Sequence, residues 1–326
     1  MSSRARIVEV LDRASGFISG DAIARELGIS RTAVWKHVSA LRRAGYEIEA
    51  SRAKGYRLVA SPQVLAPDAI QALLANCRFG FPLSVLPVTG STNDDAAALA
   101  RQGAPEGTVV LAERQTAGRG RMGRRWASLP GRSVTLSCVL RPPIPPAEAP
   151  RLSLVAALAV ACAMEAEGLR ARIKWPNDVL LGGRKVCGIL TEIEAEADTV
   201  HFVIAGIGLN VNTTRDEFPP ELRESATSMR IDAGRRFDRA RITAALLQSL
   251  ERWYGRFLGE PFDRLAAEWN RRSVTVGRRV RVTGAGEAIE GCCLGIDGDG
   301  ALLVNDGLRT HRVVAGDVTV VGGDAR

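Results

Sequence analysis

Residues 115–126 read QTAGRGRMGRRW, and no other stretch of the chain combines glycine and arginine so densely. They follow residues 107–113, a run rich in β-branched side chains that predicts a buried strand. Glycine lets the backbone approach a bound molecule closely, and arginine presents a fixed fork of donors to carboxylate or phosphate oxygens. We therefore expect this loop to enclose an anionic ligand.

The glycines Gly118, Gly120 and Gly123 also satisfy the G-x-G-x-x-G spacing of a dinucleotide-binding turn. Such a turn runs into an apolar helix and meets an acidic residue on a second strand about twenty residues later. Here two more arginines, Trp126 and a Pro-Gly turn follow instead, so we set the dinucleotide interpretation aside. A merely solvated basic loop would not account for glycines that alternate with arginines.

Downstream, apolar segments alternate with polar or glycine-rich turns. The pattern predicts strands at residues 133–140, 184–193 and 200–204 and a buried helix at residues 151–168. Pro176 should end another short strand and leave Asn177 and Asp178 in a loop, where an amide and a carboxylate can bind a ligand or a metal. A plain Asn-Asp turn is the alternative. The run GIGLN at residues 206–210 permits another close approach, and we expect these polar groups to meet at strand ends.

Lysine is rare in this chain. Only four of the 44 basic residues are lysine, namely Lys36, Lys54, Lys174 and Lys185. Arginine and lysine are interchangeable on a solvated surface but not where a compact ammonium group is needed, so each lysine is a candidate for a specific role. The alternative is that these four lysines are present by chance and have no specific role.

The first sixty residues have the spacing of a winged helix-turn-helix. Residues 6–11 and 21–27 predict helices, the second capped by Ser19, and residues 28–30 form a short turn whose Ser30 caps a third helix. The third helix exposes a face rich in hydrogen-bond donors: Arg31, Thr32, Lys36, His37 and Arg42. Residues 46–50 and 56–59 then predict two strands joined by a basic turn at residues 52–55, and residues 60–67 predict a linker.

This N-terminal segment is basic, with 11 lysines and arginines against 6 acidic residues in residues 1–60. A basic helix-turn-helix favours a polyanion partner, and we expect it to bind DNA through the third helix. A module that contacts another protein is the alternative.

The whole chain has an ordinary globular composition. Its 326 residues are 46% hydrophobic and 25% charged, which predicts two or three domains. The longest apolar run, residues 152–164, is too short to cross a membrane, and no secretory signal is visible, so we expect a cytoplasmic protein. Six cysteines without C-x-x-C spacing and three distant histidines disfavour a zinc site, a disulfide framework and a histidine-based triad.

Five motifs occur in order after the helix-turn-helix: Ser91-Thr92-Asn93, GRGRMGR, KWPND, GRKVCGIL and GIGLN. Together they resemble biotin protein ligases of the bifunctional BirA type, over essentially the full chain. The resemblance implies an α/β (α+β) protein with three domains. These are a winged helix-turn-helix at residues 1–62, a catalytic domain with a mixed sheet like that of class II synthetases at residues 63–271, and a small SH3-like β-barrel at residues 272–326.

The resemblance also implies an activity and its partners. Biotin and ATP, with Mg²⁺, would give biotinoyl-AMP, from which biotin passes to a lysine of a biotin carboxyl carrier protein domain of acetyl-CoA carboxylase or another biotin-dependent carboxylase. The adenylate-loaded ligase would form a homodimer, bind operator DNA and repress biotin biosynthesis genes. A non-catalytic biotin-responsive regulator and a lipoate ligase are the alternatives.

Site residues carry over from the motifs in the same way. Biotin and the acyl phosphate would lie against Ser91, Thr92, Asn93, Gln115, Arg119, Gly120, Arg121 and Lys185. The adenylate would lie near Arg121, Trp126, Asn177 and Asn210. Catalysis would fall to Lys185, Arg121, Arg119 and Asp178, with Lys185 stabilising the oxyanion and Asp178 positioning or deprotonating the incoming amine. Asp178 is also a candidate ligand for magnesium, but the sequence does not fix which carboxylate binds the ion.

Overall fold

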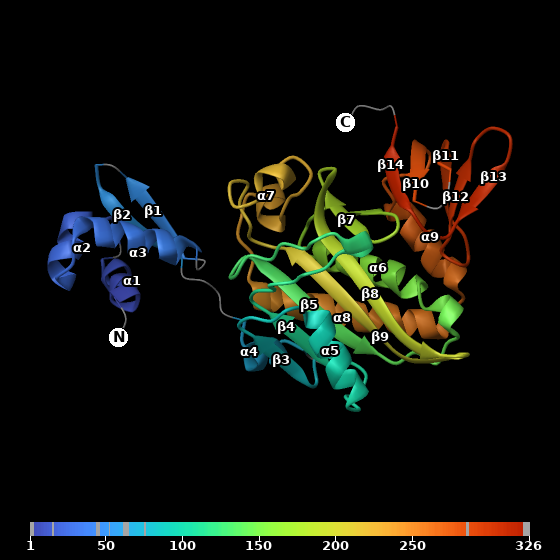
Figure 1. Ribbon diagram of the computed structural model, residues 1–326, viewed down its shortest axis with the longest axis horizontal. Coiled ribbons are helices and arrows are strands. Elements are labelled where there is room, and N and C mark those ends of the chain that lie inside the picture. Colours follow the sequence, from blue (N-terminus) through green and yellow to red (C-terminus); the bar gives the residue numbers. More distant parts are fainter. Residues whose placement is uncertain are drawn as a thin grey trace. The chain divides into compact units, whose positions relative to one another are not determined.

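The computed structural model describes residues 3–14, 16–43, 46–51, 53–60, 65–74, 76–284 and 287–321. Its contacts divide the chain into two compact units, residues 1–64 with 129–132 and residues 65–128 with 133–326 (Figure 1). Each unit is described separately below.

The first unit is a winged helix-turn-helix. It consists of α1 (Ser3–Arg13), α2 (Gly20–Leu27), α3 (Arg31–Arg43) and the antiparallel hairpin β1 (Glu47–Ser51) and β2 (Gly55–Ala60). Both predicted caps are confirmed, because Ser19 Oγ accepts a hydrogen bond from Ala22 N and Ser30 Oγ accepts one from Ala33 N. Apolar side chains from all three helices and β1 form a core of their own. Residue 52 of the basic turn and residues 61–64 of the linker lie outside the described residues.

The second unit is built on a seven-stranded mixed sheet in the order β3-β4-β5-β9-β8-β7-β6. The strands are β3 (Leu83–Leu86), β4 (Val109–Ala112), β5 (Ser133–Leu140), β6 (Arg172–Lys174), β7 (Asp178–Leu181), β8 (Arg184–Glu196) and β9 (Thr199–Asn210). Among the described strand pairs of this sheet, β3 and β4 are parallel and the others are antiparallel. The expected mixed sheet is confirmed, and the predicted strand at residues 133–140 coincides with β5.

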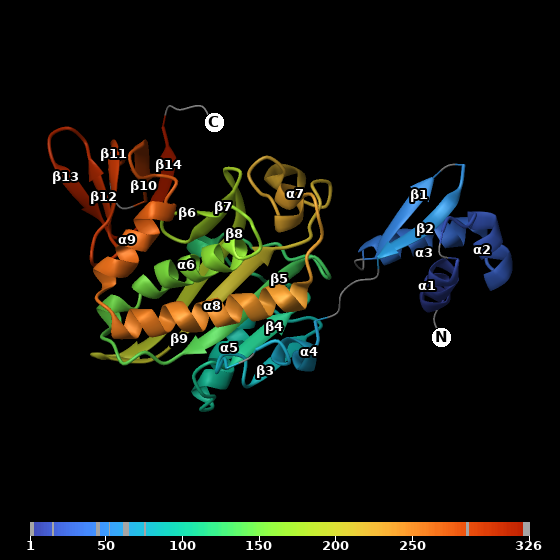
Figure 2. The ribbon, with the colours of Figure 1, turned by 180° about the vertical axis from the view of Figure 1, so that it is seen from behind.

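Helices cover both faces of this sheet. They are α4 (Pro67–Gln71), α5 (Thr92–Arg101), α6 (Arg151–Glu165), α7 (Met229–Ala233), α8 (Arg239–Gly259) and α9 (Phe262–Arg272). Figure 2 shows α6 and α8 lying across one face, where strand side chains such as Val109 and Leu111 join their core. Val110 points the other way and packs with Ala96 and Ala100 of α5, as the alternation of a strand requires.

The apolar run that contains α6 is a core helix. Residues 146–165 are long and apolar enough to cross a membrane by length and composition, but 67% of that window is buried inside the unit. Apolar all round, α6 fits between the sheet, α8 and α9, which explains its composition.

A five-stranded antiparallel sheet completes the second unit, in the order β13-β12-β11-β10-β14. Its strands are β10 (Arg279–Thr283), β11 (Ile289–Ile296), β12 (Leu302–Asn305), β13 (Thr310–Val313) and β14 (Asp317–Val320). Asn270 of α9 ties this sheet to the helices of the unit, because its side chain accepts from Ile296 N at 2.8 Å and donates to Ile296 O at 3.2 Å. The domain boundaries proposed after residues 62 and 271 stay predictions.

Two local predictions were wrong. GIGLN does not follow a strand but lies inside β9, which continues to Asn210 because β5 and β8 hydrogen-bond it on both sides. Asp178 does not lie in a loop but begins β7, paired with Lys174. Asp178 and Asn210 still stand at strand ends, as the first residue of β7 and the last of β9, whereas Gly206 and Gly208 lie inside β9.

Candidate active site

A pocket of about 540 Å³ opens on the face of the sheet that carries α5. Its lining comes from the start of α5, the arginine-rich loop, the central strands, the segment before α7 and strand β14. It brings together every residue expected to bind ligand: Ser91, Thr92, Asn93, Gln115, Arg119, Gly120, Arg121, Trp126, Asn177, Asp178, Lys185 and Asn210.

The pocket floor is one row of residues across four strands. Thr135 of β5 pairs with Gly208 of β9, which pairs with Gly188 of β8, which pairs with Asp178 of β7. A Cβ atom on Gly208 would collide with the indole of Trp126, and one on Gly188 would press against both the indole and Lys185. The two glycines therefore let Trp126 lie directly on the sheet.

One end of the pocket is a buried polar network at the start of α5. The Gln115 side chain accepts hydrogen bonds from Thr92 N at 2.8 Å and Thr92 Oγ1 at 3.0 Å. Ser137 Oγ donates to Asn93 Oδ1 at 2.6 Å, and Asn93 Nδ2 donates to Glu192 at 2.9 Å. Thr92 and Asn93 are almost completely buried, so their orientations are fixed before any ligand arrives.

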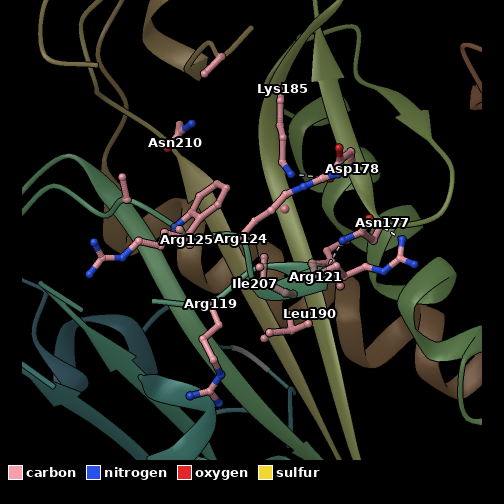
Figure 3. Close-up of a pocket in the computed structure, with 18 of the residues that line it drawn as sticks. Arg119, Arg121, Arg124, Arg125, Asn177, Asp178, Lys185, Leu190, Ile207 and Asn210 are labelled. Carbon is pink, nitrogen blue, oxygen red and sulfur yellow. Dashed lines mark hydrogen bonds and ion pairs between the residues drawn. The ribbon is translucent and has the colours of Figure 1, made fainter. Parts of the chain in front are cut away.

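The other end carries the lysine predicted to be catalytic. Lys185 Nζ lies 2.6 Å from Asp178 Oδ1, with 37% and 22% of the two side chains exposed. Asn177 Nδ2 donates to Ile189 O at 2.6 Å, and Arg121 Nη1 donates to Asn177 Oδ1 at 3.5 Å. Figure 3 shows Lys185, Asp178, Asn177 and Arg121 together on this side of the pocket. Lys185 of β8 and Arg121 of the arginine-rich loop thus line the same pocket.

The four arginines of the loop do not share one environment. Arg119 donates to both carboxylate oxygens of Asp94 and also to Glu192, and in Figure 3 its side chain points away from Lys185. These hydrogen bonds hold the pKa of Asp94 below its ordinary value. Arg124 pairs with Asp317 of β14. Arg121 instead reaches the side of the pocket that holds Asn177.

Several residues that line the pocket or hydrogen-bond its lining were not predicted. Ser137 belongs to the alternation Ser133, Thr135, Ser137, a period of two that marks the polar face of a strand and could have been recognised. No sequence pattern marks Glu192 or Asp317. They contact the loop because segments far apart in the sequence pack together. The wall formed by Phe218, Leu222, Ser225 and Ala226 was also missed.

Comparisons with known proteins agree with this geometry. Residues 85–210 match the model of the biotin/lipoate A/B protein ligase family, residues 3–57 match a helix-turn-helix domain and residues 275–321 match the biotin protein ligase C-terminal domain. The chain is 42% identical over 317 residues to the bifunctional ligase/repressor BirA of Bacillus subtilis, covering 97% of this chain and 98% of that protein. This chain belongs to the biotin/lipoate A/B protein ligase family.

Other members of the ligase family agree. The bifunctional ligase/repressor BirA of Escherichia coli is 34% identical, with 90% of this chain and 89% of that protein covered. The structure of biotin protein ligase from Aquifex aeolicus in complex with biotin and ATP superposes with a TM-score of 0.64 at 28% identity, covering 74% of this chain and 99% of that one.

Within this ligase-family chain, Asn210 has a structural partner as well as a place in the pocket. Its Nδ2 donates to Thr227 O at 3.1 Å, and Lys185 N donates to Ser225 O at 2.9 Å. Both bonds hold the segment before α7 against the strands β8 and β9. The wall of the pocket on this side is therefore positioned by the same residues that face the ligand space.

The helix-turn-helix of this ligase-family chain exposes most of its expected DNA-binding face. Arg31, Thr32 and Lys36 are exposed on α3, and His37 is half-buried. Arg42 differs, because its Nε donates to Ile48 O at 2.8 Å and so fastens the wing to α3. Trp35 of the same helix has 58% of its surface exposed.

Proposed function

We propose that this chain activates biotin with ATP to form biotinoyl-AMP and then transfers biotin to a lysine of a biotin carboxyl carrier protein domain. The acceptor would be acetyl-CoA carboxylase or another biotin-dependent carboxylase. The observation that carries the proposal is the meeting of Lys185, Asp178 and Arg121 around a glycine floor, in a chain related over nearly its whole length to ligase/repressors.

The first step joins two anions. The biotin carboxylate would attack the α-phosphate of ATP, with pyrophosphate leaving. Arg121 and Lys185 would offset the repulsion and stabilise the charge that builds at phosphorus, an effect that is strongest where donors are already in place. The Trp126 indole, held flat over Gly208 and Gly188, offers a surface for an adenine ring to stack on.

The second step is an acyl transfer. The acceptor amine would attack the carbonyl carbon of the mixed anhydride, the bond to the phosphate oxygen would break, and AMP would leave. Lys185 would stabilise the oxyanion that develops. Asp178, within 2.6 Å of Lys185 Nζ, would orient the incoming amine and accept the proton that the amine loses.

Magnesium fits this site as a companion of ATP rather than as a resident ion. Among the residues that the structure describes, no group of three or more histidine, cysteine or acidic side chains is arranged to hold a metal. Mg²⁺ is usually bound by substrate phosphates with one or two carboxylates, and Asp178 is the carboxylate on the pocket wall that would serve. The ion would neutralise phosphate charge.

We also propose a regulatory role for the N-terminal unit. The exposed Arg31, Thr32 and Lys36 would bind operator DNA, and the adenylate-loaded chain would form a homodimer that represses biotin biosynthesis genes. The similarity to proteins named ligase/repressor supports this. Because ATP, the carboxylase and DNA must all be accessible, we place the protein in the cytoplasm.

A mass-shift assay tests the activity. The chain is incubated with ATP, a carrier domain and either biotin or lipoate. The mass of the carrier domain is then measured by mass spectrometry. We expect the biotinyl adduct alone. A lipoyl adduct would establish the lipoate alternative, and no adduct with tight biotin binding would establish the non-catalytic regulator, against which the presence of Lys185, Arg121 and Asp178 argues.

A further inference from the structure

The loop is attached to the rest of the unit at two of its arginines. Arg119 Nη1 and Nη2 donate to Asp94 at 2.7 and 2.6 Å, and Arg119 Nη2 donates to Glu192 at 3.0 Å. Asp94 lies in the first turn of α5 and Glu192 lies on β8. Further along, Arg124 pairs with Asp317 of β14. Arg121 lies between these two attachments.

The charges around Arg119 do not suit an anionic ligand. One guanidinium group is surrounded by two carboxylates, so the cluster carries an excess negative charge, and a carboxylate or phosphate brought to Arg119 would be repelled. The hydrogen bonds to Asp94 are the largest cause that raises the pKa of Arg119, in keeping with this pairing. The positive charge of Arg119 is therefore already neutralised and does not favour an anionic ligand.

The backbone supports an attachment role. Arg119 and Arg125 form an isolated antiparallel bridge, and Gly120 N donates to Arg124 O at 2.7 Å. The segment between them is a closed hairpin with Arg121 near its tip. Holding Arg119 and Arg124 at the base of this hairpin fixes where Arg121 points.

We propose that Arg119 is not a ligand-binding arginine but fastens the loop, and that Asp94 and Glu192 are positioning residues that place Arg121 and Gly120 over the ligand. The inference rests on the proposed function for its ligand, and it revises the role expected for Arg119 from the sequence. These ion pairs hold the loop in place before the ligand arrives, so they set the affinity for biotin more than the rate of the chemistry.

The test compares Asp94→Asn combined with Glu192→Gln against Arg119→Gln. We expect each to raise KM for biotin about tenfold, in line with losing two partly exposed ion pairs, with kcat changed less. Combining all three substitutions should add nothing further. Trypsin should cut the unliganded loop at Arg121, Arg124 and Arg125 correspondingly faster in each variant.

Asp94→Asn alone leaves the hydrogen bond between Glu192 and Asn93 in place. We expect this variant to raise KM for biotin less than the double variant does. A rise in KM in this variant is then due to the lost attachment of Arg119 and not to a disturbed Asn93. The exchanged pair, Asp94→Arg with Arg119→Asp, should restore part of the affinity and the protease resistance. A matched control is Glu194→Gln, because Arg101 and Glu194 form an ion pair at 2.7 Å between the same helix and strand but outside the pocket lining. This control should leave both readouts unchanged.

The competing role predicts opposite results. If Arg119 bound the ligand, removing its two carboxylates would free it and lower KM, and the exchanged pair would abolish binding. Either outcome, or protease resistance that does not change, overturns the proposal. Proteolysis of the unliganded chain needs no activity, so a wild-type chain that fails to adenylate biotin would refute the proposed function without deciding the role of Arg119.

Discussion

Arg119 and Arg121 are two positions apart, yet their surroundings give them different chemistry. Arg119 is neutralised by carboxylates of α5 and β8, whereas Arg121 contacts a neutral amide beside the ammonium group of Lys185. An uncompensated positive charge is what a phosphate needs. At the scale of single residues, therefore, the partner of a side chain decides its role more than its place in a motif.

Replacing Lys185 or Arg121 by alanine should strongly slow adenylate formation. Each change removes a donor placed toward developing negative charge, which typically costs about 100- to 1,000-fold in kcat. Biotin-dependent exchange of pyrophosphate into ATP measures this step. Lys54→Ala in the wing is the matched control and should leave the exchange rate unchanged, and an unchanged rate in Lys185→Ala would contradict the site.

Among the elements, β8 and β9 do most to build the pocket, since they supply its floor and hold the wall before α7. The sequence predicted where these strands begin, because alternating apolar residues show which face is buried. It did not predict that β9 continues through its glycines, because this depends on β5 and β8 lying on either side. The same limit hid Glu192 and Asp317, which reach the loop only through long-range pairing.

Two glycine substitutions separate the role of the floor from general stability. Gly208→Ala should displace the Trp126 indole and slow adenylate formation about tenfold to 100-fold, because misplacement of a binding surface is costly. Gly255→Ala on the exposed side of α8 meets no atom within 4 Å and should raise the free energy of unfolding by about 0.5–1 kcal/mol. Urea unfolding and pyrophosphate exchange check both. Normal exchange in Gly208→Ala would show that Trp126 does not serve the ligand.

At the scale of the whole molecule, the two units have separate cores. The helix-turn-helix spacing predicted a separate core in the first sixty residues, since this segment carries its own apolar pattern. The division of the rest of the chain into two domains stays a prediction. Changes on the exposed face of α3 should therefore affect DNA binding without disturbing the ligase pocket.

The double variant Arg31→Ala, Lys36→Ala tests this independence. Losing two phosphate contacts should weaken DNA binding and reduce the slope of log affinity against log salt by about 2, since each contact contributes about 1. Adenylate formation should stay at the wild-type rate. Arg13→Ala, which removes an ion pair with Glu26 between α1 and α2, is the control for general loss of charge. A salt slope that does not change would argue for a protein partner instead.

The ion pair of Arg124 with Asp317 joins residues 193 positions apart. During translation the arginine leaves the ribosome long before β14 exists, so the nascent hairpin has nothing to hold it on that side. Domains fold as they are made, at about 5–20 residues per second, which leaves the growing chain for many seconds with an incomplete pocket. The arginine-rich loop therefore gains its attachment to β14 only after the last strand of the unit has been made.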